Sequence, residues 1–387
     1  YIGFNTGKLD LEFGVWNSET TTGFLDGASF ARISPLTALS QDQTNNIFSV
    51  KANYQVNENV SSTITLSTGT DDIEQNESTD FTEIDQLGLD WQNDIVVDEN
   101  QLITVGLALT RQDFQSRFRA SLTEQQIDNN AIYVQDNIQL ENHDIVLGLR
   151  HTDNNGFGEE TTWSIDYGFH LTESTQLIAN VGTAFRTPGA FDLSSNPSLD
   201  PETSRNIEIG IRYSPSRNQS FRASAFKNEI DNLITFDPNR PTTASPFGSS
   251  NNIQQATIEG LELGYNFNVN SFNTSIEAII QNPVNDTTGD VLLRRAKRSV
   301  TAQIDYTENK LYLGANILLS SQRNDIGNTE NAGYFLLNLL SAYDISPKWT
   351  VRARLENALD KQYELANGFN TTDRTFFFEL GYTPFKK

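Results

Sequence analysis

Residues 349–364 read WTVRARLENALDKQYE, and the first eight of them alternate between apolar and polar side chains. A repeat of two residues is typical of a β-strand, in which successive side chains point to opposite faces. One face carries Trp349, Val351, Ala353 and Leu355, and the other carries Thr350, Arg352, Arg354 and Glu356. The strand is therefore predicted to separate an apolar environment from one that accepts charge.

The same alternation recurs along the whole chain, in about 18 segments of roughly ten residues, which is the length of a membrane-crossing strand. Clear examples are 9–15, 103–109, 163–169, 207–213, 261–267 and 376–382. No helical period separates these segments, which argues against α/β folds. The sequence predicts an all-β protein.

The connections between the segments alternate in length. Short ones lie at 56–60, 96–100, 171–175, 214–220, 306–310 and 345–349. Long ones, rich in loop-forming residues, lie at 18–44, 114–127, 186–201, 236–251, 282–292, 322–331 and 359–373. A soluble propeller or sandwich would also alternate in hydropathy, but it gives no reason for the connections to alternate. A transmembrane antiparallel up-and-down β-barrel explains both patterns.

The barrel prediction also explains the charged face of residues 349–356. Arg352, Arg354 and Glu356 are expected to point into an aqueous lumen, because an arginine facing lipid near the midplane costs about 2–4 kcal/mol. Aromatic residues near strand ends, such as Tyr306, Trp349 and Tyr382, fit the interfacial belts of such barrels.

Composition excludes several other classes of protein. The chain has 387 residues and no run of 18 apolar residues, so no transmembrane helix is predicted. The net charge of −23 argues against nucleic-acid binding, which needs a basic surface. The acidity suits solubility or a salty habitat, or divalent cation binding in loops. There is no cysteine and no nucleophile or metalloenzyme motif, so an enzyme is not predicted.

Residues 182–213, GTAFRTPGAFDLSSNPSLDPETSRNIEIGIRY, resemble the TonB-dependent outer-membrane receptors. Residues 292–306, LLRRAKRSVTAQIDY, and the tail from Leu355 resemble later strands of that family. The segment 292–297 is most similar to the cobalamin-receptor branch. The resemblance implies a barrel of 22 strands filled by a plug domain. It also implies uptake of a large, scarce nutrient by binding and gated passage, without catalysis.

The resemblance covers only the barrel. We expect one transmembrane domain over 1–387, incomplete at its N-terminus, with no plug and with a strand pair missing near 70–81. Either the sequence omits parts of a longer protein, or the barrel is reduced and plugless. The second case would suit a structural anchor or passive pore in a larger envelope assembly.

The expected partners follow from the family. They are outer-membrane lipid, lipopolysaccharide, a large nutrient ligand, the TonB system if a plug exists, and other envelope proteins, but no nucleic acid. The resemblance places the chain in the bacterial outer membrane, with long loops outside and both termini in the periplasm.

Candidate ligand contacts lie in the long connections. Arg295 and Lys297 belong to the densest cationic cluster of an acidic chain, and alternation would place them on one face. They could meet an anionic ligand, or lipopolysaccharide phosphates and strand carboxylates. Arg186, at a strand end, could contact ligand or brace its loop. Phe24 and Phe114 are expected to be exposed loop aromatics that contact a large ligand or pack among loops.

No cofactor is required by the predicted function. The family resemblance points to a calcium site in the first long loop, where Asp26 and Asp42 are the two candidate ligands. The acidic pair expected before the next strand reads Gln41, Asp42 and Gln43, which weakens the calcium prediction.

Overall fold

The computed structural model describes residues 2–25, 38–118, 121–242 and 248–383. These residues form twenty-one strands and one short helix, α1 (Ala190–Ser195). The strands before α1 are β1 (Ile2–Asn5), β2 (Leu9–Leu25), β3 (Ala38–Asn57), β4 (Val60–Gln75), β5 (Phe81–Asp98), β6 (Gln101–Phe118), β7 (Ser121–Leu140), β8 (His143–Asn154), β9 (Gly158–Thr172) and β10 (Thr175–Arg186). The prediction of an all-β fold is confirmed.

The remaining strands follow α1. They are β11 (Glu202–Ser216), β12 (Gln219–Asp237), β13 (Ser249–Val269), β14 (Phe272–Asn285), β15 (Arg298–Glu308), β16 (Leu311–Ser320), β17 (Arg323–Asp325), β18 (Thr329–Asn331), β19 (Tyr334–Ser346), β20 (Trp349–Glu356) and β21 (Thr375–Tyr382). Apart from the short β1, β17 and β18, this leaves eighteen long strands in the described chain, which matches the predicted number.

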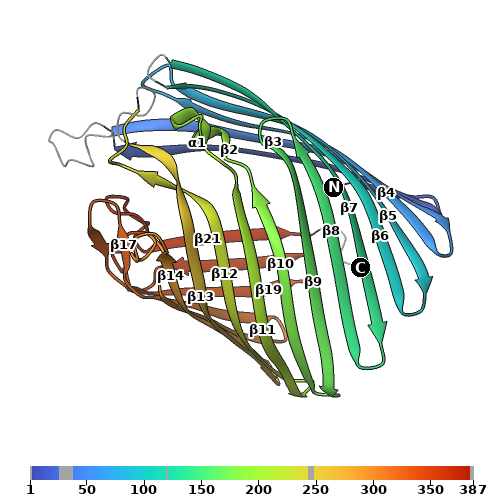
Figure 1. Cartoon of the computed structure of the whole chain (residues 1–387). Helices are drawn as coiled ribbons and strands as arrows, with labels where there is room; N and C mark the ends of the chain where they lie inside the picture. The colour runs from blue at the N-terminus through green and yellow to red at the C-terminus, as the bar shows by residue number, and fades with distance from the viewer. Residues whose placement is uncertain (1, 26–37, 119–120, 243–247, 384–387) are drawn as a thin grey trace. The chain divides into compact units, whose positions relative to one another are not determined.

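Nineteen of these strands belong to one antiparallel sheet, and β17 and β18 form a separate hairpin. Contacts group the residues into two compact units. The first unit comprises Tyr1–Tyr167, Val181–Arg205 and Asp231–Ile253, and the second comprises Gly168–Asn180, Asn206–Ile230 and Gln254–Lys387. In the first unit, β1 to β8 pair in chain order (Figure 1).

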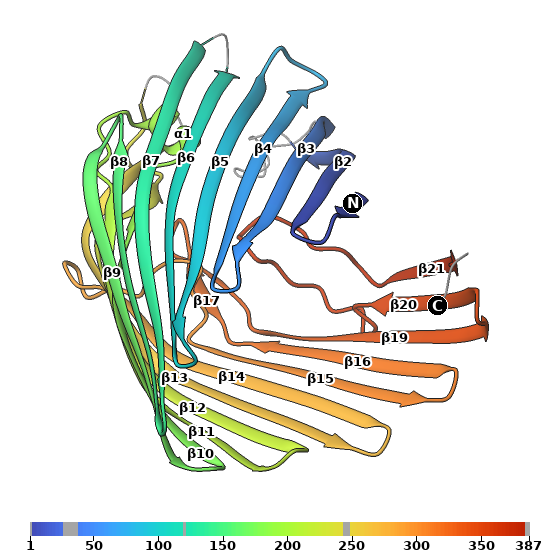
Figure 2. The same ribbon diagram turned by 90° about the vertical axis from the view of Figure 1, so that its right-hand side faces the viewer.

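In the second unit, β13 to β16 pair in chain order, and β16 then pairs with β19, which pairs with β20 and β20 with β21 (Figure 2). Strand β19 lies beside β16 because β17 and β18 belong to the connection between them. This is the predicted up-and-down order. No helix in the described ranges is both long and apolar enough to cross a membrane.

The register explains the alternating pattern. Leu339 of β19 pairs with Leu355 of β20, which pairs with Phe376 of β21, and these side chains share the apolar face. One residue earlier in β20, Arg354 pairs with Leu340 and Phe377 on the polar face. On the polar face of the first unit, Gly106 leaves room for the ring of Tyr133, which a Cβ at this position would meet at 2.1 Å.

Several predicted loops are shorter than the sequence indicated. Strand β2 continues to Leu25 and β3 begins at Ala38, within the predicted loop 18–44, and β6 and β7 occupy most of 114–127. The predicted loop 322–331 contains the β17–β18 hairpin. Hydropathy misses these extensions because strands beyond an apolar band are polar on both faces, whereas backbone pairing continues. Near 70–81, β4 and β5 pair directly, from Val60 with Ile95 to Glu74 with Phe81.

Candidate functional site

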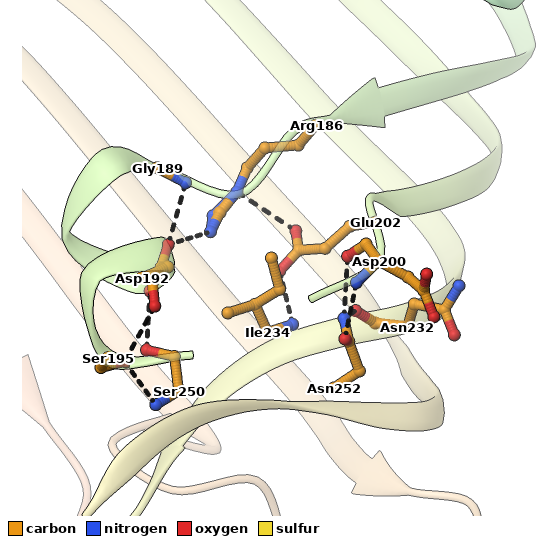
Figure 3. Close-up of polar contacts among 10 residues, drawn as sticks. All are labelled: Arg186, Gly189, Asp192, Ser195, Asp200, Glu202, Asn232, Ile234, Ser250 and Asn252. Atoms are coloured by element: carbon orange, nitrogen blue, oxygen red, sulfur yellow. Dashed lines mark hydrogen bonds and ion pairs between the residues drawn. The ribbon is translucent and has the colours of Figure 1, made fainter. Parts of the chain in front are cut away.

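Arg186 lies at the end of β10 and braces the connection that contains α1 (Figure 3). Its Nε atom lies 3.3 Å from Glu202 Oε2, and its Nη2 atom lies 3.6 Å from Asp192 Oδ2. Glu202 also accepts a hydrogen bond of 2.7 Å from the backbone N–H of Ile234, which joins this connection to β12. Of the two roles considered for Arg186, the geometry shows the structural brace.

A second set of contacts joins the same connection to the start of β13. The Ser250 hydroxyl donates to Asp192 Oδ1 at 2.8 Å, and the Ser250 backbone N–H donates to the Ser195 hydroxyl at 3.0 Å. Asn252 exchanges two hydrogen bonds of 2.9 Å with the backbone of Asp200. Its amide also donates to the Asn232 carbonyl at 2.7 Å (Figure 3). These contacts hold the β10–β11 connection against the end of β12 and the start of β13, within the first unit.

In the second unit, Asp325 joins three connections. Its side chain is completely buried and accepts a hydrogen bond of 2.7 Å from Arg294 Nε, which lies between β14 and β15. Asp325 also accepts a hydrogen bond of 2.5 Å from the backbone N–H of Asn367, which lies between β20 and β21. The Ile326 N–H and the Asn331 amide complete the set, at 2.7 and 3.0 Å. We call these contacts the Asp325 clamp.

The clamp also sets the protonation of its carboxylate. Burial alone would raise the pKa of Asp325, but the hydrogen bonds from Asn367, Arg294 and Ile326 outweigh burial and lower the pKa. Asp325 therefore remains ionised at neutral pH. Arg294, which donates to this carboxylate, has a left-handed backbone conformation with φ of 59°.

Arg295 and Lys297 lie directly after the clamped Arg294. Both side chains are exposed, and neither forms an ion pair with another residue in the described part of the chain. The prediction that alternation places them on one face of a strand is wrong, because β15 begins only at Arg298. They lie on an irregular segment that begins next to Arg294, which is bound to Asp325.

The two aromatic candidates have different outcomes. Phe114 is not an exposed loop residue: it lies in β6, opposite Ile84 of β5, and is only 2% exposed. It packs as a core residue, because the strand extends through the predicted loop. Phe24 belongs to β2 in register with Leu39, and its side chain lies outside the described part of the structure.

Only one of the two calcium candidates lies among the described residues. Asp26 lies outside them. Asp42 lies in β3 and accepts a hydrogen bond of 2.6 Å from the Thr21 hydroxyl of β2. Among the described residues, no group of three or more acidic or histidine side chains has the arrangement of a metal site.

The charged face of β20 is internally paired. Arg352 forms an ion pair with Glu379 of β21, and Arg354 Nε lies 3.1 Å from Glu356. Arg354 also lies over the ring of Phe377, at 4.3 Å from its centroid. One partner on the neighbouring strand and one within β20 therefore offset the charges that the sequence places on this face.

Sequence reasoning missed the residues that hold the connections together. Asp325, Asn252 and Glu202 carried no recognisable motif of their own, since Asn and Asp are common in any loop. Glu202 follows Pro201 within the stretch that carried the family resemblance, which was the one available signal. The partners of Asp325 are separated from it by up to 42 residues.

Comparison with known proteins agrees with this architecture. The family described as "TonB dependent receptor-like, beta-barrel" matches residues 3–358. The chain is 26% identical over 293 residues to the vitamin B12 transporter BtuB of Photobacterium profundum, covering 74% of this chain and 48% of the relative. It is 30% identical over 245 residues to BtuB of Vibrio vulnificus, covering 62% and 39%. The chain thus spans less than half the length of these relatives.

Solved structures share the fold. The ferric enterobactin receptor PfeA of Pseudomonas aeruginosa, in complex with BCV-L6, matches with a TM-score of 0.78 at 18% identity, over 98% of this chain and 69% of that one. The FrpB iron transporter of Neisseria meningitidis matches with a TM-score of 0.80 at 14% identity, over 98% and 70%. With its alternating strands, antiparallel order and family match over residues 3–358, the chain belongs to the TonB-dependent receptor β-barrel family of the outer membrane.

Proposed function

We propose that this chain is the barrel of a transporter that takes up a large, scarce nutrient similar to cobalamin. The observation that most directly supports this proposal is the match to two curated relatives named as vitamin B12 transporters, over 74% and 62% of the chain. The segment 292–297 supports the same branch. Transport here means binding and gated passage, with no covalent chemistry.

The braced connections would serve as the outer binding surface. In this proposal the long connections face outwards and the termini lie in the periplasm. Arg295 and Lys297 would contact an anionic group of the ligand, because both are exposed and are presented by the segment that Arg294 anchors to Asp325. A braced surface binds more tightly than a flexible one, since less conformational entropy is lost on binding.

Energy for release would come from the TonB system acting on a plug in the lumen, as the family implies. The polar face of the strands supports this proposal, because cross-strand pairs such as Arg352–Glu379 give the lumen a hydrated, charged wall. The partners of the complete protein would then be the nutrient, the TonB system, and lipid with lipopolysaccharide.

The proposal is tested with the full-length protein from its native outer membrane. Equilibrium binding of cyanocobalamin and of ferric enterobactin is measured side by side, and uptake is measured in cells with and without an active TonB system. We expect saturable cyanocobalamin binding and TonB-dependent uptake. Binding of ferric enterobactin alone would overturn the choice of nutrient. A large constant conductance in bilayers with no ligand binding would overturn active transport and favour a passive pore.

A further inference from the structure

The apolar face of the second unit has a groove that extends from β14 to β21, over β15, β16, β19 and β20. Its floor is made by three small residues on neighbouring strands, Ala315, Ser341 and Ala353. Its walls include Leu313, Leu339 and Leu355, and the groove has a volume of about 640 Å³. The floor is low because Ala353 pairs with Ser341, so that large side chains flank two small ones.

Aromatic pairs mark one end of this groove. The Phe272 and Tyr306 rings lie 4.9 Å apart, and the Trp349 and Tyr382 rings lie 4.6 Å apart. Both pairs lie near the tight turns that join the strands. Aromatic residues gather at the level of the lipid headgroups in membrane proteins. The turn end of the groove therefore lies at one membrane interface, and the groove runs from it into the apolar layer.

The two turns beside the groove carry positive charge. Lys310 lies in the β15–β16 turn, three residues before Leu313, and Lys348 lies in the β19–β20 turn, directly before Trp349. Both lysines are exposed, and neither side chain forms an ion pair within the described chain. Glu308 is the nearby carboxylate on the same face, and it accepts a hydrogen bond from the Tyr306 hydroxyl.

Three turns of the first unit, β3–β4, β5–β6 and β7–β8, instead carry Glu58, Glu99 and Glu141, although Lys8 lies between β1 and β2. Backbone hydrogen bonds hold the two basic turns in place. The carbonyl of Lys310 accepts a hydrogen bond from the Asp344 N–H, and the carbonyl of Lys348 accepts one from the Thr383 N–H, at 2.9 Å each. The lysine side chains are thus presented from fixed backbone positions beside an apolar groove.

We propose that this groove binds one glycerophospholipid with an anionic headgroup. One acyl chain lies over Ala315 and Ala353, and the headgroup phosphate contacts Lys310 and Lys348. The dimensions agree, because three strand residues separate Lys310 from Leu313, or roughly 10 Å along the strand. Apolar walls match an acyl chain, and cations near a membrane surface attract anionic lipid.

The position of the lysines selects phospholipid over lipopolysaccharide as the source of the phosphate. Both lysines lie at the turn end of the strands. The cationic Arg298 lies at the opposite end of the same face, since it shares the parity of Val300 and Tyr306 in β15. This choice rests on the orientation given in the proposed function, in which the turns face the periplasm and lipopolysaccharide lies in the opposite leaflet. The groove is therefore assigned to the phospholipid leaflet on the turn side.

The test uses the full-length protein extracted in mild detergent. Native mass spectrometry counts the retained lipids, and titration with phosphatidylglycerol and phosphatidylcholine measures selectivity. Three variants are compared: Lys310→Gln with Lys348→Gln, Ala353→Phe, and Arg217→Gln as a matched charge change at another turn. We expect one retained phosphatidylglycerol, with affinity reduced on the order of tenfold in the double lysine variant.

The remaining outcomes are equally decisive. Ala353→Phe should weaken the binding of both lipids, because the larger side chain fills the groove. Arg217→Gln should bind both lipids with the affinity of the wild type. The proposal fails if the double lysine variant retains phosphatidylglycerol as the wild type does, or if only lipopolysaccharide copurifies. It also fails if Arg217→Gln loses as much lipid affinity as the double lysine variant. Should Ala353→Phe fail to fold, the lysine variant alone decides, because its substitutions lie in exposed turns. Loss of nutrient binding would not affect this result, since it depends only on the barrel and its membrane.

Discussion

Arg294 donates a hydrogen bond of 2.7 Å to Asp325, and the Asp325 side chain has no exposed surface, whereas that of Arg294 is 46% exposed. The pair joins the connection before β15 to the β17–β18 hairpin. A buried carboxylate is costly unless its hydrogen bonds are complete, and here Asn331 and the backbone of Ile326 and Asn367 complete them. Through these bonds Asp325 joins three connections of the second unit.

Replacing Asp325 with asparagine should loosen all three connections together. The charge-assisted bond from Arg294 is lost, and an amide cannot accept from every donor that the carboxylate satisfies. We expect faster hydrogen exchange at 291–297 and 365–368, measured by mass spectrometry, with strands β14 to β16 unchanged. Arg240→Gln, which removes an exposed pair with Asp237, is the control and should change little. Faster exchange confined to Asp325's own hairpin would contradict the clamp.

The contribution of Asp325 should depend on pH in a defined direction. Its pKa is lower in the folded protein than in the unfolded chain, so its stabilising effect is complete above the ordinary carboxyl pKa of about 4. The effect is lost as pH falls through the lower, folded pKa. We expect the difference in free energy of unfolding between wild type and Asp325→Asn to be constant from about pH 7 to 5 and to shrink below about pH 4. A difference that grows on acidification would rule out this assignment.

The brace at Arg186 should be less sensitive to loss of the arginine than to loss of its acidic partner. Arg186 is half exposed, so its pairs are screened and should contribute about 1 kcal/mol or less. Glu202 is only 14% exposed and also satisfies the Ile234 backbone N–H. We expect Glu202→Ala to destabilise the protein by about 1–3 kcal/mol, more than Arg186→Ala, in denaturant unfolding. Equal losses would mean that the ion pair, and not the backbone bond, dominates.

Two adjacent leucines test which face meets lipid. Leu337 of β19 pairs with Ile317 on the apolar face, whereas Leu336 pairs with Leu318 on the opposite face. We expect Leu337→Arg to cost about 2–4 kcal/mol in folding into lipid bilayers, because the charge faces hydrocarbon. Leu336→Arg serves as the matched control and should cost clearly less. The reverse order would mean that the assignment of the two faces is wrong.

Ligand affinity should depend on the cations next to the clamp. We expect Arg295→Glu combined with Lys297→Glu to weaken binding of an anionic ligand by roughly tenfold or more, with stability unchanged, because both side chains are exposed and unpaired among the described residues. Binding is measured at two salt concentrations, and the wild-type affinity should fall as salt rises. Arg217→Glu, in a tight turn, is the control. An unchanged affinity in the double variant would remove both residues from the ligand site.

The sequence by itself determined the all-β class, the alternating faces, the order of short and long connections and the family. These follow from a local rule, because a strand between lipid and water must alternate with a period of two. The pattern of residues 349–356 was enough to predict which side chains share a face, and the register of β19 to β21 confirms it.

Only the tertiary structure decided where strands end and what holds the connections. Phe114 reads as a loop residue because its neighbours are polar, yet backbone pairing with β5 and β7 continues past it and buries it. Asp325 and Arg294 are 31 residues apart, and Asn367 lies 42 residues from Asp325. Such partners meet only after the strands between them have fixed their register, and no local pattern of side chains records that distance.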